Sequence, residues 1–502
     1  MAVSTILVGR FLGPELYGQY SLAIVVPSLL LLFADLGINQ GITKFTASLR
    51  AKGETERLAK IIQHGLILRA AAGIAIFILN YALADFFASV FLQRPDLAFY
   101  TRIASTAILF QVIFVTAVSA FVGLDKTEYN ALATNIQAIA KAIISIALVL
   151  LGFSITGALI GYVTSYVIAA LVALAILYLV LQENRNPSNN QNISNDIKAM
   201  IRYGAPLYAS LILIGLLPLY QSVVLAFFTT DTDIGNYKAA SNFIALISIL
   251  SIPIATALLP AFSKLDSSTK QKITTFFKLA NKSTTIIIIP VTVLIIIFAN
   301  EIVQIVYGSD YQSAPLFLEA FCLLYFSVGL GYLTLHSFYN GLGETKTTLK
   351  MSIINFLALL VLSPILTRTY NVIGLIAASL TASFLSTAYG SYIARKNHQV
   401  KFDTASTVRI YLIAMLAGVP PLLLRLAPLP DLMIITAGGL LYLFIYATLV
   451  PLARIINNNE LHIAEQIIHE IPILAQIGRP ILKYEQKILN TKHNHDPPHT
   501  NK

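Results

Sequence analysis

The feature of this sequence that most constrains its fold is a long series of apolar runs separated by short polar links. A helix needs about 20 apolar residues to cross a hydrocarbon core of ~30 Å, and within lipid only helices or closed barrels satisfy the backbone polar groups. Only 12% of the 502 residues are charged, against about 25% in soluble domains. We therefore predict an all-α, polytopic membrane protein. The thirteen full spans that we expect are 17–44, 61–84, 98–122, 130–151, 156–181, 203–228, 236–262, 283–299, 315–340, 347–367, 372–394, 408–426 and 431–453.

Basic side chains are distributed unevenly between alternate loops. The loops expected on one side of the membrane hold 17 lysines and arginines, whereas those on the other side hold 3, namely Arg94, Arg368 and Arg425. The positive-inside rule places the richer side in the cytoplasm. This distribution accounts for the net charge of +10, so no nucleic-acid partner is predicted.

The two halves of the chain resemble each other at an offset of 216–218 residues. GQYSLA at 18–23 corresponds to GNYKAA at 235–240, and SITGALI at 154–160 corresponds to NVIGLIA at 371–377. Six helices separate the halves, an even number, so both halves have the same orientation in the membrane. We predict two parallel, pseudo-repeated six-helix lobes around a central cavity, as in many transporters. Two further matches occur in the same order, around 85 and 301 and after 121 and 338.

The repeat also suggests what the opening segment 1–12 is. This segment is mostly apolar but too short to cross a membrane. Its counterpart helix begins near Arg202, and the equivalent position, 217 residues earlier, would precede Met1. We therefore expect the outer half of a truncated first span, in a 14-helix plan. The predicted regions are an N-terminal lobe 1–181, a cytoplasmic linker 182–202, a C-terminal lobe 203–394, two additional helices 395–455 and a cytoplasmic tail 456–502.

The tail first alternates Ile and Leu with charges, a pattern typical of an interfacial amphipathic helix. Its polar end contains His493, His495 and His499. We interpret this end as a disordered terminus rather than a metal site.

Sequence motifs for catalysis are missing. The chain has no HExxH, no P-loop and no GxSxG with suitable partners, and the single Cys322 excludes a disulfide framework or a thiolate metal site. DTD at 231–233 lies in a short outer turn and is interpreted as a solvated loop. We predict a protein that is not an enzyme, with no catalytic residue, cofactor or metal.

Ionisable residues within a span are costly and are therefore functional candidates. Lys141 lies near the middle of its expected span and shares one helix face with Thr134 and Gln137. Ser352 and Asn355 are the repeat counterparts of those two polar residues, whereas Leu359 replaces the lysine. We predict that both polar stripes line a hydrated, substrate-binding cavity. The alternative is interhelical hydrogen bonding in a dry bundle.

Asp35 and Arg69 form a second candidate, because each lies nine residues from a lysine at the inner end of neighbouring spans. In an antiparallel helix pair they would reach a similar depth, where an ion pair lowers the cost of burial. The pair is interpreted either as a structural element of the hairpin or as an ion-coupling or gating element.

Glu319 and His336 share one expected span and are further candidates for ion coupling or gating. Arg10, Arg102 and Lys238 lie towards the outer ends of spans, where their side chains can snorkel to the interface.

Four segments carry a resemblance to a known family: RFLGPELYGQY at 10–20, FADLGINQGITKF at 33–45, VYGSDYQSA at 306–314 and GLGETK at 341–346. Across roughly 1–455 the sequence resembles polysaccharide flippases, a branch of the superfamily that also includes multidrug and toxin extruders and lipid II flippases. The resemblance implies an exporter with two lobes and 12–14 helices, a cationic cavity and an ion gradient as driving force. Lys141 and Arg69 suit that cavity by position, although no family motif assigns them to it.

The function that the resemblance implies is movement of a polyprenyl-diphosphate-linked oligosaccharide from the cytoplasmic to the outer leaflet of the cell membrane. Its partners would be this substrate, membrane lipids and glycosyltransferases or other glycan-assembly proteins. Three alternatives stay open: a cation-coupled multidrug-type antiporter, a membrane glycan polymerase or ligase, and a scaffold for glycan assembly.

Overall fold

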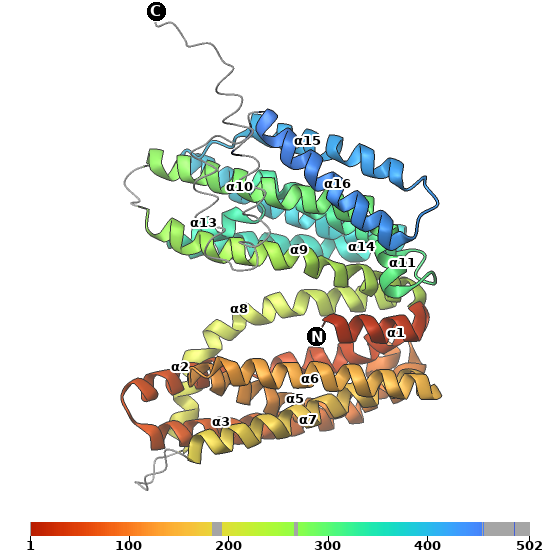
Figure 1. The fold of residues 1–502 in the computed structure, drawn as a ribbon. Helices are drawn as coiled ribbons and strands as arrows, with labels where there is room; N and C mark the ends of the chain where they lie inside the picture. The colour runs from red at the N-terminus through yellow and green to blue at the C-terminus, as the bar shows by residue number, and fades with distance from the viewer. Residues whose placement is uncertain (1, 183–192, 266–269, 454, 456–485, 487–502) are drawn as a thin grey trace, which may run out of the picture. The chain divides into compact units, whose positions relative to one another are not determined.

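The computed structural model describes residues 2–182, 193–265, 270–453, 455 and 486. All secondary-structure elements of these residues are helical (Figure 1), which confirms the predicted all-α fold. Within them, nine helical segments are long and apolar enough to cross a membrane, and Ala314–Leu330 with Thr334–Gly341, bent by 44°, would form a tenth. The polytopic architecture is therefore confirmed, whereas the count of thirteen full spans and the predicted domain boundaries stay predictions. The predicted tail helix and the terminal histidines lie outside the described residues.

The chain divides into two compact units, and the first comprises Met1–Asn242, Tyr307–Ser313 and Ser363–Leu375. Within this unit α3, α5, α6 and α7 lie side by side (Figure 1) around a core that includes Ile62 and Phe121. Its helices are α1 (Ala2–Phe33), α2 (Ile38–Ala51), α3 (Thr55–Ala82), α4 (Ala84–Phe86), η1 (Phe87–Phe91), η2 (Pro95–Leu97), α5 (Ala98–Gly123), α6 (Thr127–Leu148), η3 (Val149–Phe153), α7 (Ser154–Gln182), α8 (Ile193–Phe228) and the start of α9 (Asp231–Ser263).

The second unit comprises Phe243–Val306, Ala314–Leu362 and Ile376–Lys502. Its α10, α15 and α16 pack around a core that includes Phe298 and Tyr442. Beyond the rest of α9, its helices are α10 (Lys270–Ile297), α11 (Ala299–Tyr307), α12 (Ala314–Cys322), η4 (Leu323–Leu330), α13 (Thr334–Gly341), most of α14 (Thr345–His398), α15 (Thr404–Leu424) and α16 (Asp431–Leu452).

Several expected spans are interrupted where the backbone leaves helical geometry. The expected span 17–44 is wrong as one helix, because α1 ends at Phe33 and α2 begins at Ile38 after two residues with positive φ, Leu36 and Gly37. A further break lies at Gly13 within α1, where φ is 75°. The expected span 315–340 is also broken, into α12, η4 and α13. Such breaks depend on tertiary contacts that satisfy the freed backbone groups within a membrane.

The internal repeat is visible in the local backbone geometry. The link after α5 closes with Lys126 N donating to Phe121 O at 2.9 Å, and the link after α13 closes with Glu344 N donating to Tyr339 O at 2.8 Å. These donors and acceptors are each 218 residues apart. The same correspondence, at 217, joins two residues held at positive φ, Ser154 (48°) before α7 and Asn371 (51°) within α14. The offset read from the sequence therefore relates equivalent turns in the structure.

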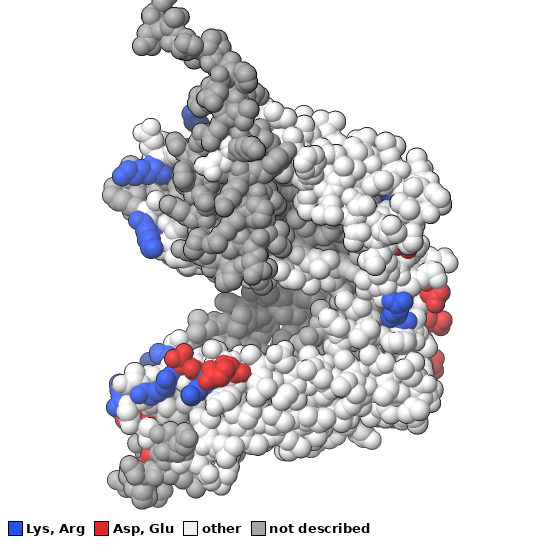
Figure 2. All heavy atoms as spheres, in the orientation of Figure 1, with Lys and Arg blue, Asp and Glu red and all other residues white. Residues whose placement is uncertain are grey.

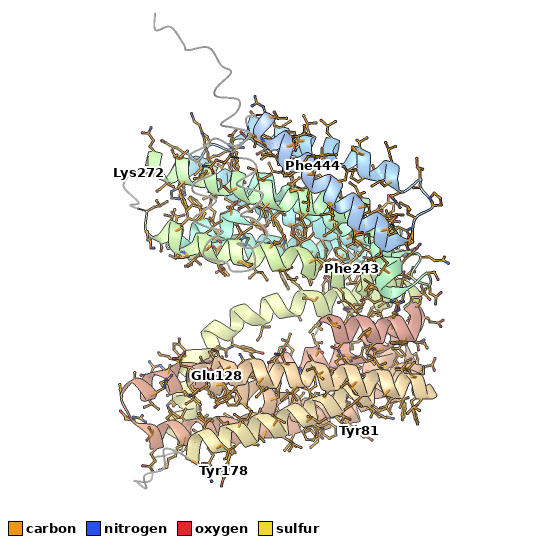
Figure 3. All side chains as sticks on the ribbon, in the orientation of Figure 1. Tyr81, Glu128, Tyr178, Phe243, Lys272 and Phe444 are labelled. Carbon is orange, nitrogen blue, oxygen red and sulfur yellow. The ribbon has the colours of Figure 1, made fainter. Side chains whose placement is uncertain are left out.

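The surfaces of both units have the character expected of membrane helices. In the view of Figure 2, charged side chains lie near the helix ends and leave the surface along the helices free of charge. Figure 3 shows Glu128 at the start of α6 and Tyr178 near the end of α7 at one end of the first unit, with Tyr81 towards the other end. Along the helices, large apolar side chains are exposed, among them Ile143, Leu171 and Phe444.

Candidate functional site

Lys141 lies within the first unit, where α6 packs against α1 and α7. Its ammonium donates to Thr5 Oγ1 at 3.2 Å and lies 5.6 Å from the ring centroid of Tyr162. Among the described residues Lys141 forms no ion pair. The structure thus holds a cation inside the helix bundle with a hydroxyl and an aromatic face as its partners, an arrangement that leaves it able to attract an anion.

The polar residues that share one face of α6 do not all line the same kind of surface. Gln137 is only 2% exposed and donates to Ser165 Oγ on α7 at 3.0 Å. Ser145, one turn beyond Lys141, donates to Ala158 O at 3.2 Å. For these two positions the structure shows interhelical hydrogen bonding, the alternative to a hydrated cavity. Thr134 is half-buried and donates to Asn130 Oδ1 within its own helix at 3.2 Å.

The corresponding stripe on α14 repeats this arrangement in the second unit. Asn355 Nδ2 donates to Ser383 Oγ at 3.2 Å, and both residues lie 218 positions after the Gln137–Ser165 pair. Ser352 is exposed, and Leu359, at the position equivalent to Lys141, is buried. The two repeats therefore share the helix-joining hydrogen bond but differ in charge.

Asp35 and Arg69 form the predicted ion pair in the first unit. Arg69 Nε lies 3.9 Å from Asp35 Oδ1, and the two side chains are 3% and 10% exposed, respectively. Asp35 also accepts from the backbone N of Asn39 at 3.1 Å, while Thr116 Oγ1 lies 3.4 Å from Arg69 Nε. The hydroxyl of Tyr208 donates to Leu32 O at the same break between α1 and α2. The break turns Asp35 into the bundle, where it meets Arg69 from α3.

Glu319 and His336 lie on different helices, α12 and α13, on either side of the bend in the second unit. Glu319 interacts electrostatically with Arg425, and His336 is half-buried. The sequence predicts that the two residues share one span; the structure places them on two helices that are bent by 44° and together could form that span. Their role in ion coupling or gating stays a prediction.

Among the ion pairs that the sequence does not predict, two have partly buried side chains and join distant segments. In the second unit Arg425 Nε lies 2.6 Å from Glu301 Oε1, and the Glu301 side chain is only 6% exposed. In the first unit Arg94 Nε donates to Asp231 Oδ1 at 2.9 Å, and Gln19 Nε2 donates to Asp231 Oδ2 at 3.0 Å. The interpretation of Asp231 as part of a solvated loop is thus wrong. The only sequence signal that pointed to Glu301 of the Arg425–Glu301 pair is the repeat match between the segments around residues 85 and 301, each of which contains an acidic residue.

The Arg94 guanidinium also closes the end of α8. Its Nη2 donates to Thr229 O at 2.8 Å and its Nη1 to Ala226 O at 3.3 Å. Last-turn carbonyls of a helix lack intrahelical partners, so an arginine that binds them stabilises the helix end. Arg94, Asp231 and Gln19, which we name the Arg94 clasp, thus join α1, the α4–α5 segment and the α8–α9 turn.

Lys238 also differs from expectation, because its ammonium binds a neighbouring helix within the first unit. It donates to Ser222 Oγ on α8 at 2.8 Å, and Ser222 is fully buried. Arg102, by contrast, pairs with Asp85 on the exposed surface. A lysine near a span end can therefore be held by a neighbouring helix when a hydroxyl is within reach.

Together, the apolar helices, the repeated helix pairs and the buried cations define a polytopic membrane protein of the transporter class. The profile of the polysaccharide biosynthesis protein family matches residues 2–266, more than half of the chain, and the chain belongs to this family. It is 22% identical over 446 residues to the lipid II flippase MurJ of Bacillus subtilis (strain 168), covering 80% of each protein. It is also 22% identical over 313 residues to the succinoglycan biosynthesis transport protein ExoT of Rhizobium meliloti (strain 1021), covering 62% of this chain and 60% of ExoT.

Solved structures share the fold. A lipid II flippase MurJ in an inward closed conformation matches with a TM-score of 0.66 and 17% identity, over 89% of this chain and 97% of that one. An inward-facing multidrug resistance MATE family transporter of the MOP superfamily matches with a TM-score of 0.67 and 16% identity, over 79% and 93%. At these identities the similarity concerns the fold alone, and it is the fold that the sequence resemblance implied.

Proposed function

We propose that this protein is a flippase that moves a polyprenyl-diphosphate-linked oligosaccharide from the cytoplasmic to the outer leaflet of the cell membrane. The observation that carries the proposal is the Lys141 ammonium, which lies inside the helix bundle without an ion-pair partner among the described residues. A buried cation of this kind suits a ligand that brings its own negative charge, and a diphosphate forms strong charge-assisted hydrogen bonds with an ammonium.

Family membership supports transport rather than catalysis. The two relatives are named as a lipid II flippase and a succinoglycan biosynthesis transport protein. A membrane polymerase or ligase is the less favoured alternative, because the sequence offers no catalytic motif or long outer loop.

In the proposed mechanism the residues divide into two groups. In the first unit, Lys141, assisted by Arg69, binds the diphosphate, Thr134 contacts the glycan from a less buried position, and Gln137 positions α6 by joining it to α7. In the second unit, Ser352 is the counterpart candidate for binding, and Asn355 positions its helix segment through Ser383.

Transport by alternating access requires that the loaded head group favour one state and that a coupling ion bias the return. Asp35 is our candidate for the coupling group, because protonation or a bound cation would release its hold on Arg69. Glu319 and His336 are the candidates in the second unit. Glycosyltransferases or other glycan-assembly proteins would supply the substrate on the cytoplasmic side.

A cation-coupled multidrug antiporter is the second candidate, favoured by the fold shared with the MATE transporter. The two functions differ in what accumulates when the protein is missing. A flippase mutant accumulates lipid-linked oligosaccharide and keeps its drug resistance, whereas an antiporter mutant becomes drug-sensitive with normal glycan export.

The decisive experiment complements a deletion strain with the wild type, Lys141→Ala, Lys141→Arg or the control Lys52→Ala, whose lysine is exposed at the end of α2. We expect Lys141→Ala to abolish surface glycan export at unchanged membrane abundance, Lys141→Arg to keep part of it, and the control to export normally. Wild-type export by Lys141→Ala would refute the assigned role of this lysine.

A further inference from the structure

The second unit has a hollow where α14 ends and α15 begins. It has a volume of about 530 Å³ and is lined by Arg395, Gln399, Val400, Lys401 and Phe402. The guanidinium of Arg395 lies 5.2 Å from the ring centroid of Phe402. The hollow is thus a concave surface with two cationic side chains and an apolar floor, outside the buried site proposed above.

The charge around this hollow is strongly positive. Along the chain, the acidic residue nearest to the hollow is Asp403, whose carboxylate caps α15 by accepting from Ser406 N at 3.0 Å. A second carboxylate, that of Glu344, lies 2.9 Å from Nε2 of His398, beside the lining residue Gln399. Burial alone would raise the pKa of Asp403, but the hydrogen bonds from Ser406 and the charges of Lys282 and Lys278 lower it below its ordinary value. Two lysines of α10 therefore lie within electrostatic range of the same helix start, and together with Arg395 and Lys401 they outnumber the carboxylates of Asp403 and Glu344.

The side chains beside the hollow are of the kinds that occur where helices leave the apolar part of a bilayer. Tyr392, one turn before Arg395, is 58% exposed and lies 5.8 Å from the Lys396 ammonium. Exposed tyrosines and lysines of this kind are typical of the membrane–water interface. On α15, Val408 and Leu412 are more than half exposed and begin an apolar surface one turn after the hollow.

We propose that this hollow binds the phosphate of an anionic phospholipid headgroup, with the acyl chains lying along the exposed apolar side chains of α15. Basic clusters at the cytoplasmic end of membrane helices attract anionic lipids, and each cation adds to the attraction. Arg395 and Lys401 contact the phosphate, and Lys278 and Lys282 add long-range attraction. This inference does not depend on the proposed flippase activity, because the lipid is a bound constituent of the membrane rather than the transported substrate.

The experiment uses the full-length protein, purified in neutral detergent, and measures binding of fluorescent short-chain phosphatidylglycerol. The test variant is Arg395→Gln/Lys401→Gln. The matched control, Lys52→Gln/Lys198→Gln, removes the same charge from exposed positions in the first unit. We expect at least tenfold weaker binding for the test variant and unchanged binding for the control, with phosphatidylcholine bound weakly by all three. Raising the salt concentration should weaken wild-type binding.

The sources of phosphate are separated by competition with inorganic phosphate and pyrophosphate. If inorganic phosphate or pyrophosphate displaces the lipid at equal concentration, the hollow is a site for free phosphate or diphosphate, and the lipid proposal is overturned. Equal binding by the test variant and the control would also overturn it. Because the wild type and the variants are compared for lipid binding alone, loss of binding with normal glycan export would leave the proposed function intact. Circular dichroism and gel filtration of each variant establish that it is folded.

Discussion

At the scale of single residues, the Asp35–Arg69 pair gives the sharpest prediction. Arg69 is only 3% exposed, so Asp35→Asn would leave a buried guanidinium without its carboxylate. Loss of one partner of a buried pair costs about 3–5 kcal/mol, and we expect a clear fall in the thermal unfolding midpoint and in export. The double reversal Asp35→Arg/Arg69→Asp should recover much of what each single reversal loses. A double variant no better than its worse parent would argue against the contact.

The exposed pair Arg102–Asp85 provides the matched control, since it joins the same residue types at 36% and 70% exposure. Surface ion pairs contribute about 0–1 kcal/mol. Arg102→Gln should therefore leave the unfolding midpoint nearly unchanged.

These residues also show how far sequence reasoning reaches. The depth of Asp35 and Arg69 could be predicted, because both positions were counted from lysines at the ends of adjacent helices. The partners of Asp231 could not, because Arg94 is 137 residues away and nothing in the local sequence connects them. The sequence places Gln137 on the same helix face as Lys141. Whether that face contacts water or α7 depends on how the helices pack, which the sequence of one helix does not determine.

At the scale of elements, the Arg94 clasp predicts that two neighbouring aspartates differ in how much they contribute to stability. Asp231 binds Arg94 and Gln19, whereas the side chain of Asp233 accepts, within the described part of the chain, from Thr230 on the exposed surface. We expect Asp231→Asn to lower the free energy of unfolding by about 3 kcal/mol because it leaves the partly buried Arg94 uncompensated. The matched Asp233→Asn should cost under about 1 kcal/mol. Denaturant titration of both variants measures the difference, and equal losses would contradict the clasp.

Close helix contacts beside the clasp explain why glycine occurs at repeat-related positions. A Cβ on Gly18 would lie 1.9 Å from Asp231 O, and one on Gly235 would lie 1.8 Å from Pro14 O. We expect Gly18→Ala and Gly235→Ala each to cost about 3 kcal/mol or more, because the obstacle is backbone and cannot rotate away. Gly439→Ala is the control, since its Cβ would meet no atom closer than 4.0 Å. Folded yield on gel filtration is the measurement, and normal yields for the first two variants would refute the close approach.

The helices themselves could be predicted because apolar runs and their repeat determine where membrane helices lie. Their interruptions could not, because the break before α2 places Leu36, a residue that disfavours positive φ, at 50°. The break is held by tertiary contact, with Gly37 against the backbone of Gly204 on α8. The local sequence around the break cannot predict this contact, because the partner Gly204 lies on another helix.

At the scale of the whole molecule, the two repeats share helix-joining hydrogen bonds but differ in their charged residues. The Gln137–Ser165 and Asn355–Ser383 pairs join equivalent helices in the two units, whereas Lys141 is matched by the buried Leu359. Likewise Asp85 and Glu301 occupy equivalent positions but pair with arginines from non-equivalent helices. The two units therefore resemble each other in their helix contacts but differ in their buried charges.

The orientation of the whole molecule can be tested because the chain has a single cysteine, the buried Cys322. In a Cys322→Ser background, we expect cysteines at Asp96 and Arg368 to react in intact cells with a membrane-impermeant maleimide. Cysteines at Lys52 and Lys270 should react only after the cells are permeabilised. All four positions are exposed in the structure, so their accessibility reports sidedness rather than burial. The reason is electrostatic, since the loops expected with Lys52 and Lys270 carry 17 basic residues against 3 on the other side. Labelling of Lys52→Cys in intact cells would show that the topology is the inverse of the predicted one. The proposed direction of transport and the cytoplasmic location of the lipid-binding hollow would then also be wrong.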